Sequence, residues 1–258
     1  MLHINKVKGV VFDVDETLLD TGLDDRKNAV HEQARLQATY EAGRKYNLPA
    51  LLAVTPEENI NFFLDSPVHS LEGALWYMLY VTGTVDSDLL DPSHPLLREL
   101  AVRKNILAEL GLRERGKPVA GAVEFITWLA EDHGLKDRLA IASTASRTEL
   151  DIFLAEITSL KQYFPDARIF SKDNITHHKP HPEAFDKAFL SLGLPDSARS
   201  RVLAFEDNPR GIRSAKEAGL YTCAITTIHS RAHLAALEVP PDVIADSFAE
   251  FRRLLDQA

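Results

Sequence analysis

GVVFDVDETL, residues 9–18, is the stretch that decides the fold of this chain. Its apolar first half predicts a buried strand, and the strand ends in two carboxylates one residue apart, Asp13 and Asp15. Like charges at this spacing destabilise each other unless a cation or a proton lies between them. Most Asp-x-Asp pairs are solvated turns or helix caps. Three further polar groups along the chain favour another interpretation, in which these carboxylates hold a divalent metal and one of them attacks phosphorus.

A second polar group follows the apolar run 139–142 and precedes a helix expected over 147–160. Hydroxyl groups at a strand-to-helix turn bind phosphate oxygens, with help from the unpaired N–H groups of the helix start. Ser143 is the expected phosphate ligand, and Thr144 is its neighbour in the same role. The alternative is ordinary helix capping by Thr144 or Ser146.

The third group is Lys179-Pro180. An ammonium pairs with a phosphate and a nearby carboxylate at once, whereas the alternative is a surface lysine in a loop. The histidines at 177, 178 and 181 invite a zinc interpretation, but no cysteine accompanies them and their spacing matches no closed ligand set. We therefore expect no zinc site there.

The fourth group, Glu206-Asp207, ends the apolar run 202–206 and precedes a helix that Gly219 closes. Adjacent acids at a strand end supply oxygen ligands for Mg²⁺. Capping of the helix by Asp207 or Asn208 is the alternative, and it is compatible with metal binding.

The four groups fit one sheet. Alternation of strands and helices indicates an α/β fold, a Rossmann-like parallel sheet with helices on both faces, and ligands bind at the carboxyl ends of such strands. We expect this core over 1–20 and 120–258; residues 243–246 either add an edge strand or pack outside. Strand-like runs lie at 8–13, 138–143, 167–171, 202–206 and 221–226, and helical stretches at 121–133, 147–162, 183–193, 209–218 and 247–256.

Residues 21–119 show no convincing strand and predict an inserted all-helical cap domain. Helices are expected over 25–46, from Thr55, over 71–81, and over 96–110 with an end at Gly111. A cap excludes water and brings specificity groups to the substrate. The candidate specificity residues are its cationic side chains, for which a solvated helix face is the alternative: His31, Arg44, Lys45 and Arg103, with Arg35, Arg98 and Lys104 beside them.

In this order, Asp-x-Asp-x-Thr, apolar-Ser, Lys-Pro and Glu-Asp resemble the motifs of the haloacid dehalogenase superfamily. The stretch from Glu206 to Gly219 is similar to its helical-cap branch, which includes phosphoglycolate phosphatases and beta-phosphoglucomutases. The resemblance implies that Asp13 is the nucleophile, forming an aspartyl-phosphate, and that Asp15 is the general acid and base. It implies phosphate binding by Ser143 and Lys179. It also implies an Mg²⁺ site made by Asp13, the backbone carbonyl of Asp15, Glu206 and Asp207.

Two positions depart from that branch. Glu16 stands where Gly or Asn is usual, and Asp-x-Asp-Glu-Thr occurs in phosphoprotein phosphatases of the superfamily that lack a large cap. The substrate branch therefore stays open. His178 replaces a small residue, and we expect it on the surface.

The composition agrees with an enzyme that acts on small molecules. The chain has 29 basic and 38 acidic residues, a net charge of −9, which argues against nucleic acid or an anionic membrane as partner. The single cysteine, Cys223, favours a cytoplasmic protein. We expect an Mg²⁺-dependent phosphatase of a small phosphorylated metabolite, with a sugar phosphate as one candidate, that is a monomer or weak homodimer. The alternatives are a phosphosugar mutase, a phosphoprotein phosphatase and a non-catalytic phospholigand-binding protein.

Overall fold

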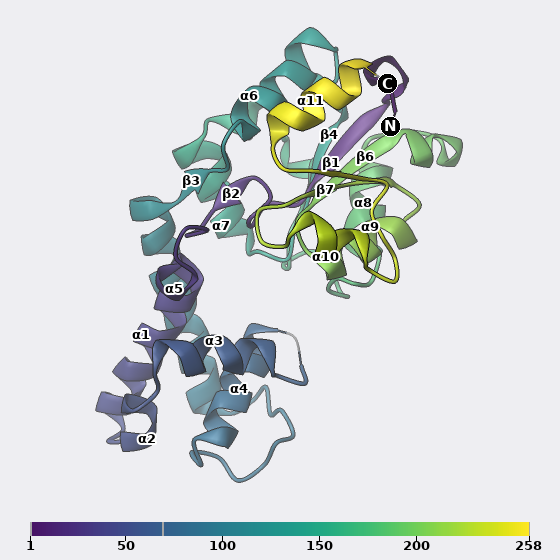
Figure 1. Cartoon of the computed structure of the whole chain (residues 1–258). Helices are drawn as coiled ribbons and strands as arrows, with labels where there is room; N and C mark the ends of the chain where they lie inside the picture. The colour runs from purple at the N-terminus through teal and green to yellow at the C-terminus, as the bar shows by residue number, and fades with distance from the viewer. Residues whose placement is uncertain (1, 69, 258) are drawn as a thin grey trace. The chain divides into compact units, whose positions relative to one another are not determined.

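The computed structural model describes residues 2–68 and 70–257, which divide into two compact units (Figure 1). The sheet unit comprises Met1–Asp20 and Lys117–Ala258, and the helical unit comprises Thr21–Gly116. In the part of the chain that the structure describes, no helix has both the length and the apolar character needed to cross a bilayer.

Six strands of the sheet unit form one parallel sheet, and β1 (Gly9–Phe12) lies inside it between β4 and β6. Phe12 is in register with Ile141 of β4 and with Phe205 of β6. Because the strands of this sheet pair in parallel, their carboxyl ends meet at one edge, and the predicted α/β class is confirmed. The described residues give the strand order β5 (Ile169–Phe170), β4 (Leu139–Ala142), β1, β6 (Val202–Glu206), β7 (Tyr221–Ile225), β8 (Val243–Ala245).

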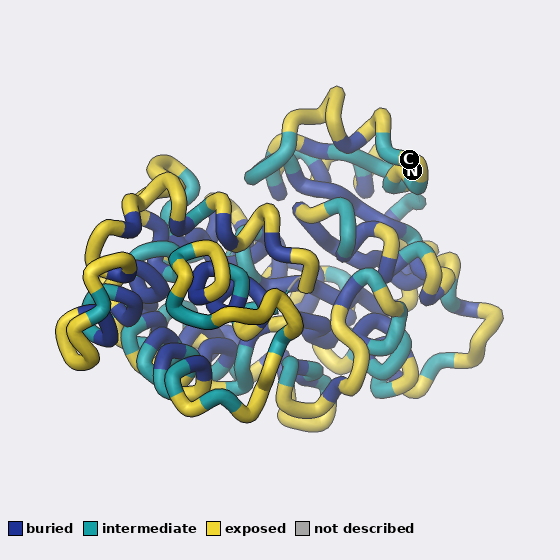
Figure 2. Tube along the Cα trace, turned by 90° about the horizontal axis from the view of Figure 1, so that it is seen from below, coloured by how far each residue is buried: buried dark blue, intermediate teal, exposed yellow. Residues whose placement is uncertain are grey.

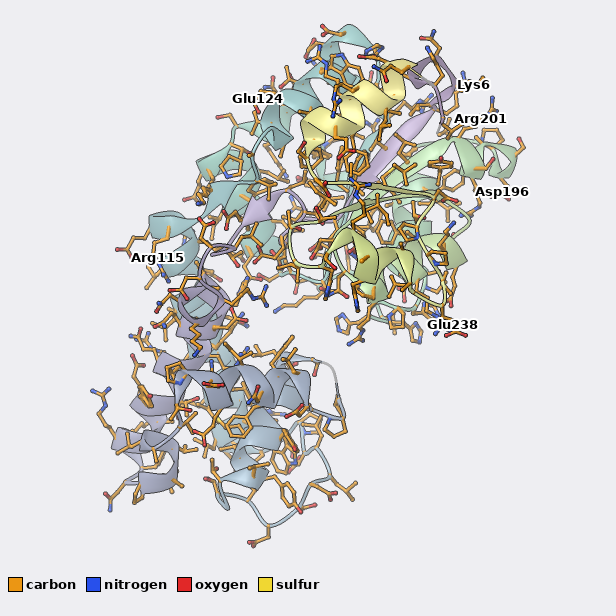
Figure 3. All side chains as sticks on the ribbon, viewed as in Figure 1. Lys6, Arg115, Glu124, Asp196, Arg201 and Glu238 are labelled. Atoms are coloured by element: carbon orange, nitrogen blue, oxygen red, sulfur yellow. The ribbon has the colours of Figure 1, made fainter. Side chains whose placement is uncertain are left out.

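Helices cover both faces of this sheet. On one face, the Phe205 ring contacts Phe125 of α6 (Ala122–Thr127) and Phe251 of α11 (Phe248–Gln257) at centroid distances of 5.3 and 4.8 Å. On the other face, α8 (Glu183–Ser191) and α9 (Pro209–Glu217) pack against the sheet. Burial of each large apolar side chain stabilises the fold by about 1.5–3 kcal/mol. In Figure 2 the buried stretches of the chain lie inward of exposed loops. Charged residues such as Lys6 and Asp196 lie on the outside of this unit (Figure 3).

Several elements of the sheet unit differ in detail from expectation. Residues 243–245 form an edge strand beside β7, which decides the open alternative. The helix expected over 121–133 continues beyond α6 as a π-helical turn, Trp128–Asp132. The helix expected over 147–162 is α7 (Arg147–Asp151), a π-helical stretch, Ile152–Ile157, and a separate 3₁₀ turn. Ser159, with a left-handed φ of 60°, interrupts it. A short helix, α10 (Arg231–Ala235), follows β7.

The helical unit is built on the packing of α1 (Val30–Lys45) along α5 (Pro95–Arg115). Within residues 21–68 and 70–116 the structure contains helices and no strand. Thr55 caps α3 through a capping box with Glu58, as the sequence indicates. The remaining helices are α2 (Pro49–Leu52), α3 (Pro56–Leu64) and α4 (Leu71–Val81).

Two helix ends in this unit were wrongly expected. The helix expected from residue 25 is a 3₁₀ turn, Arg26–Asn28, followed by α1 from Val30, because Ala29 with ψ 149° interrupts the helical backbone. The helix expected to end at Gly111 continues to Arg115. A Cβ on Gly111 would lie 3.0 Å from Cγ1 of Val30, so this glycine permits close packing of α5 on α1.

The chain passes between the units through two adjacent strands. β2 (Leu19–Asp20) pairs with β3 (Lys117–Pro118) in antiparallel fashion. The Lys117 ammonium lies 3.2 Å from the Asp20 carboxylate. The expectation of a strand-free segment from 21 to 119 is therefore wrong at its last residues.

Candidate active site

Three carboxylates gather where β1 and β6 end. The Asp13 N–H donates to the carbonyl of Phe205 at 3.0 Å, which extends the pairing of the two strands by one residue. This places Asp13 beside Glu206 and Asp207, and all three side chains are buried. They offer ligand oxygens that all lie within 4.8 Å of one another.

The buried ammonium of Lys179 joins this group. Its Nζ donates to Oδ1 of Asp13 and to Oε1 of Glu206, at 2.6 Å in each case. It also lies 4.7 Å from the centroid of the Phe185 ring at the start of α8. The predicted ion pair of this lysine with site carboxylates is present, and the alternative of an exposed loop lysine is excluded.

The site holds more negative charge than Lys179 balances. Burial raises the pKa of Asp13 to about 7, against the opposing effect of the Lys179 charge. Burial, with the charges of Glu206 and Asp13, also raises the pKa of Asp207 well above its usual value. Burial alone would lower the pKa of Lys179, but the two carboxylates outweigh it and raise that pKa. A cation bound here would stabilise the ionised carboxylates.

The donor set fits a hard divalent cation. Asp13, Glu206 and Asp207 supply only carboxylate oxygens, the ligands that Mg²⁺ prefers. The Thr17 hydroxyl donates to Oδ1 of Asp207 at 3.0 Å and orients it. Thr17 belongs to the Asp-x-Asp-x-Thr motif, but the sequence did not assign this bond.

Glu206 is fixed against the first turn of α9. Its Oε2 accepts the N–H groups of Asp207 and Asn208, both at 3.1 Å. A Cβ on Gly211 would lie only 1.7 Å from Oε1 of Glu206. The carboxylate therefore occupies the space that any other side chain at 211 would fill. Asn208 caps the helix by accepting the Arg210 N–H at 3.0 Å, so of the two expected caps it is Asn208 that serves.

The loop that carries Lys179 is held to α9 by two hydrogen bonds. The Arg210 guanidinium donates to the Lys179 carbonyl, and the Ser214 hydroxyl donates to the His181 carbonyl, both at 2.7 Å. The Lys179-Pro180 peptide is cis. Sequence reasoning missed Arg210 and Ser214, because a polar residue in a helix gives no signal of the main-chain carbonyl that its side chain reaches.

Asp15 and Glu16 lie in the turn after β1. Asp15 is half-buried and bridges to Leu19. Glu16 has a left-handed backbone with φ 58°, and its N–H donates to the Leu19 carbonyl at 2.7 Å. Gly and Asn adopt this conformation most readily, which explains in physical terms why they are the expected residues at this position.

The three hydroxyl residues that follow β4, Ser143, Thr144 and Ser146, differ in burial and in hydrogen-bond partners. Ser143 is buried, and its Oγ accepts the Ala145 N–H at 3.1 Å. Thr144 is exposed. Ser146, not Thr144, caps α7 through a capping box with Glu149. Because β4 lies beside β1, Ser143 and Thr144 follow the sheet at the same edge as Asp13.

Three of the four cationic residues put forward for specificity, Lys45, Arg103 and His31, make contacts within the helical unit. Lys45 binds both oxygens of Glu99 at 2.9 Å, and Arg103 makes a two-pronged contact with Glu41 at 2.5 and 3.0 Å. Their role in specificity stays a prediction. Of the other two, His31 lies 3.1 Å from the Lys104 ammonium, and Arg44 is exposed.

The chain is similar to known proteins over most of its length. The model of a family described as haloacid dehalogenase-like hydrolase matches residues 7–219. Over 215 residues the chain is 39% identical to protein CbbY of Rhodobacter capsulatus, and the alignment covers 83% of each chain. Over 214 residues it is 27% identical to fructose-1-phosphate phosphatase YqaB of Escherichia coli, which covers 82% of this chain and 93% of that one.

A solved structure shares the fold at low identity. The crystal structure of a family IA, variant 3 HAD hydrolase from Entamoeba histolytica superposes with a TM-score of 0.73 at 19% identity. The match covers 96% of this chain and 98% of that one.

Proposed function

The chain belongs to the haloacid dehalogenase-like hydrolase family, and from this premise we propose that it is an Mg²⁺-dependent phosphatase acting through an aspartyl-phosphate. The reaction class, phosphoric monoester hydrolysis, agrees with the phosphatases among its relatives. The observation that carries the proposal is the buried contact of Lys179 with Asp13 and Glu206, beside Asp207. Few other uses explain an ammonium and three carboxylates buried together at the edge of a parallel sheet.

Asp13 is the proposed nucleophile. A carboxylate oxygen attacks phosphorus, the bond from phosphorus to the ester oxygen breaks, and the phosphoryl group passes to Asp13. Asp15, two residues on in the turn after β1, gives a proton to the leaving oxygen. It then removes a proton from the water that attacks the aspartyl-phosphate, and inorganic phosphate leaves.

The charge of the site is matched to this chemistry. A pKa of about 7 leaves Asp13 only partly ionised at neutral pH without a further cation. Asp13, Glu206, Asp207 and the backbone carbonyl of Asp15 would hold Mg²⁺, which when bound supplies positive charge that keeps the nucleophile ionised and neutralises the phosphate.

The phosphoryl oxygens have proposed partners of their own. Lys179 approaches them from the loop after β5, and Ser143 with Thr144 approaches from the end of β4. The strands before these two segments, β5 and β4, end at the same edge of the sheet as β1, which Asp13 follows.

For the substrate class, we propose a sugar phosphate. The support is that the relative named fructose-1-phosphate phosphatase is similar over 93% of its own length. Small-molecule phosphatases of one fold differ in the groups around the reacting centre, so the substrate is assigned by assay.

The test is hydrolysis of a generic aryl phosphate and of a panel of sugar phosphates, with Mg²⁺ and with a chelator. Wild-type protein should release phosphate only with Mg²⁺. Asp13→Asn should lose turnover on the order of a thousandfold or more, while Asp196→Asn, an exposed control in the same unit, should keep it. Substantial turnover by Asp13→Asn would refute the assignment. Interconversion of sugar phosphates without release would indicate a mutase instead.

A further inference from the structure

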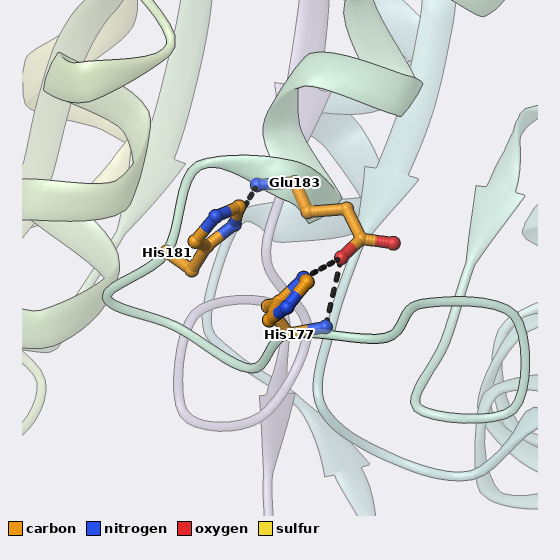
Figure 4. A group of neighbouring side chains, drawn as sticks. All are labelled: His177, His181 and Glu183. Atoms are coloured by element: carbon orange, nitrogen blue, oxygen red, sulfur yellow. Dashed lines mark hydrogen bonds and ion pairs between the residues drawn. The ribbon is translucent and has the colours of Figure 1, made fainter.

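We propose that His177, His181 and Glu183 (Figure 4) form a second metal site, for a zinc-like ion. Both histidines are exposed and belong to the loop that carries the buried Lys179. Each residue offers one ligand atom, and these atoms all lie within 4.8 Å of one another. The site is separate from the three buried carboxylates at the strand ends.

The histidine rings are already placed together. The rings of His177 and His181 stack with centroids 4.5 Å apart and an interplanar angle of 29°. Nδ1 of His177 lies 2.9 Å from Oε2 of Glu183. Around a tetrahedral Zn²⁺ with bonds of about 2.0–2.1 Å, ligand atoms lie roughly 3.3 Å apart. The ligand atoms, which lie within 4.8 Å of one another, would therefore have to approach one another by up to roughly 1.5 Å to bind one ion.

Glu183 is held in position before any metal binds. Its carboxylate accepts the N–H groups of Thr176 and His177, at 2.9 and 2.8 Å, and the Lys187 ammonium at 2.7 Å. A ligand fixed by surrounding hydrogen bonds loses little freedom when it binds a metal. Sequence spacing alone gave no zinc site, because the carboxylate that completes this set lies at the start of α8.

The ligand types favour zinc or a similar ion over magnesium. Two imidazoles and one carboxylate suit Zn²⁺, Ni²⁺ or Cu²⁺, whereas Mg²⁺ prefers oxygen ligands only. Both histidines are exposed, so water can fill the remaining coordination positions. The site adjoins a surface hollow of about 550 Å³ that His178 and Arg213 also line.

Occupancy of the site should affect Lys179, and this part rests on the proposed function. His177 and His181 lie two residues to either side of Lys179. One ion bound to both would draw the two sides of the loop together and shift the backbone that carries the lysine. Its two 2.6 Å contacts would then lengthen, so zinc should inhibit turnover.

The binding test measures the number of zinc ions bound per molecule by the whole 258-residue chain after its metals have been removed. Calorimetric titration with Zn²⁺ in excess Mg²⁺ compares wild type, His177→Ala/His181→Ala, and His229→Ala/His233→Ala. The control pair also stacks, at 4.8 Å, but belongs to no three-ligand group among the described residues. The first variant should bind one zinc fewer than wild type, and the control should match wild type. Zinc bound by the buried carboxylates is common to all three proteins.

An equal zinc count in wild type and the His177/His181 variant would overturn the site, whatever the turnover. The single variant His181→Ala, which should weaken the additional zinc at least tenfold, repeats the test with a smaller change. In the kinetic arm, zinc should inhibit wild type and the control more than the His177/His181 variant. If wild type and the His177/His181 variant bind the same number of zinc ions and both are active phosphatases, only the metal site is refuted. A zinc difference without phosphatase activity in any of the proteins refutes the proposed function alone.

Discussion

Gly211→Ala tests the packing of the site most directly. In the middle of a helix this change usually stabilises a protein by about 1 kcal/mol, because alanine has the higher helix propensity. In α9 the new methyl group would lie 1.7 Å from Oε1 of Glu206 and 1.9 Å from its carboxyl carbon. The structure therefore predicts the opposite sign.

The magnitude follows from the bonds that Glu206 must give up. To restore an ordinary contact, its carboxylate has to withdraw by roughly 1.5 Å or more. The contacts with Lys179 at 2.6 Å and with the Asp207 and Asn208 N–H groups at 3.1 Å would then exceed hydrogen-bonding distance. Disruption of a buried ion pair costs about 3–5 kcal/mol. After the helix-propensity gain, we expect a net loss of about 2–4 kcal/mol.

Urea unfolding of the metal-free protein measures this loss, and kcat/KM with Mg²⁺ measures its effect on the site. We expect a decrease on the order of a hundredfold, since a displacement of about 1 Å in a catalytic group has that effect. Gly111→Ala is the matched control: the same change in α5, with only a methyl group of Val30 nearby at 3.0 Å, should change kcat/KM little. A Gly211→Ala protein as stable and as active as wild type would refute the placement of Glu206 against α9.

Three further predictions follow from the same geometry. The pKa of Asp13 is about 7 in the fold, against a usual value of 3.8, so this group stabilises the metal-free folded state below about pH 4 and loses that contribution as the pH rises through 7. Mg²⁺ should therefore raise the melting temperature more at pH 8 than at pH 5, and equal shifts at the two pH values would contradict this. Glu16→Asn should raise the free energy of unfolding by about 1 kcal/mol, since φ 58° strains glutamate more than asparagine; denaturant titration checks it, and a less stable variant would count against strain at this turn. Arg210→Met removes the donor to the Lys179 carbonyl and should lower kcat about tenfold, whereas Arg213→Met, which breaks only an exposed pair with Glu217, should not; equal kcat values would show that the bond does not position the lysine.

The sequence predicted the strand ends well, and physics explains why. Asp13 and Glu206 each end an apolar run, and parallel strands bring such ends to one edge of a sheet. The contact between them required the strand order, since β1 lies beside β6 although about 190 residues separate the two. No local pattern encodes that order.

Other features depend on packing that the sequence does not display. Glycine commonly ends a helix, yet Gly111 lies inside α5 because Val30 packs against it. Gly211 matched a family pattern, but its function, room for the Glu206 carboxylate, becomes visible only in three dimensions. The partners of Arg210 and Ser214 are main-chain carbonyls, which every residue has, so no residue pattern signals these bonds.

The position of β1 in the middle of the sheet has a consequence for biosynthesis. Val10 pairs with Leu139 and Leu203, so this apolar strand leaves the ribosome long before either neighbour. At about 5–20 residues per second, its first partner follows roughly 6–25 seconds later. The helices of residues 21–116 all leave the ribosome before β4, and their packing, chiefly that of α1 on α5, forms in that interval. The nascent chain therefore carries an unpaired apolar segment ahead of a folded one, and this segment is where we expect a chaperone to bind during translation.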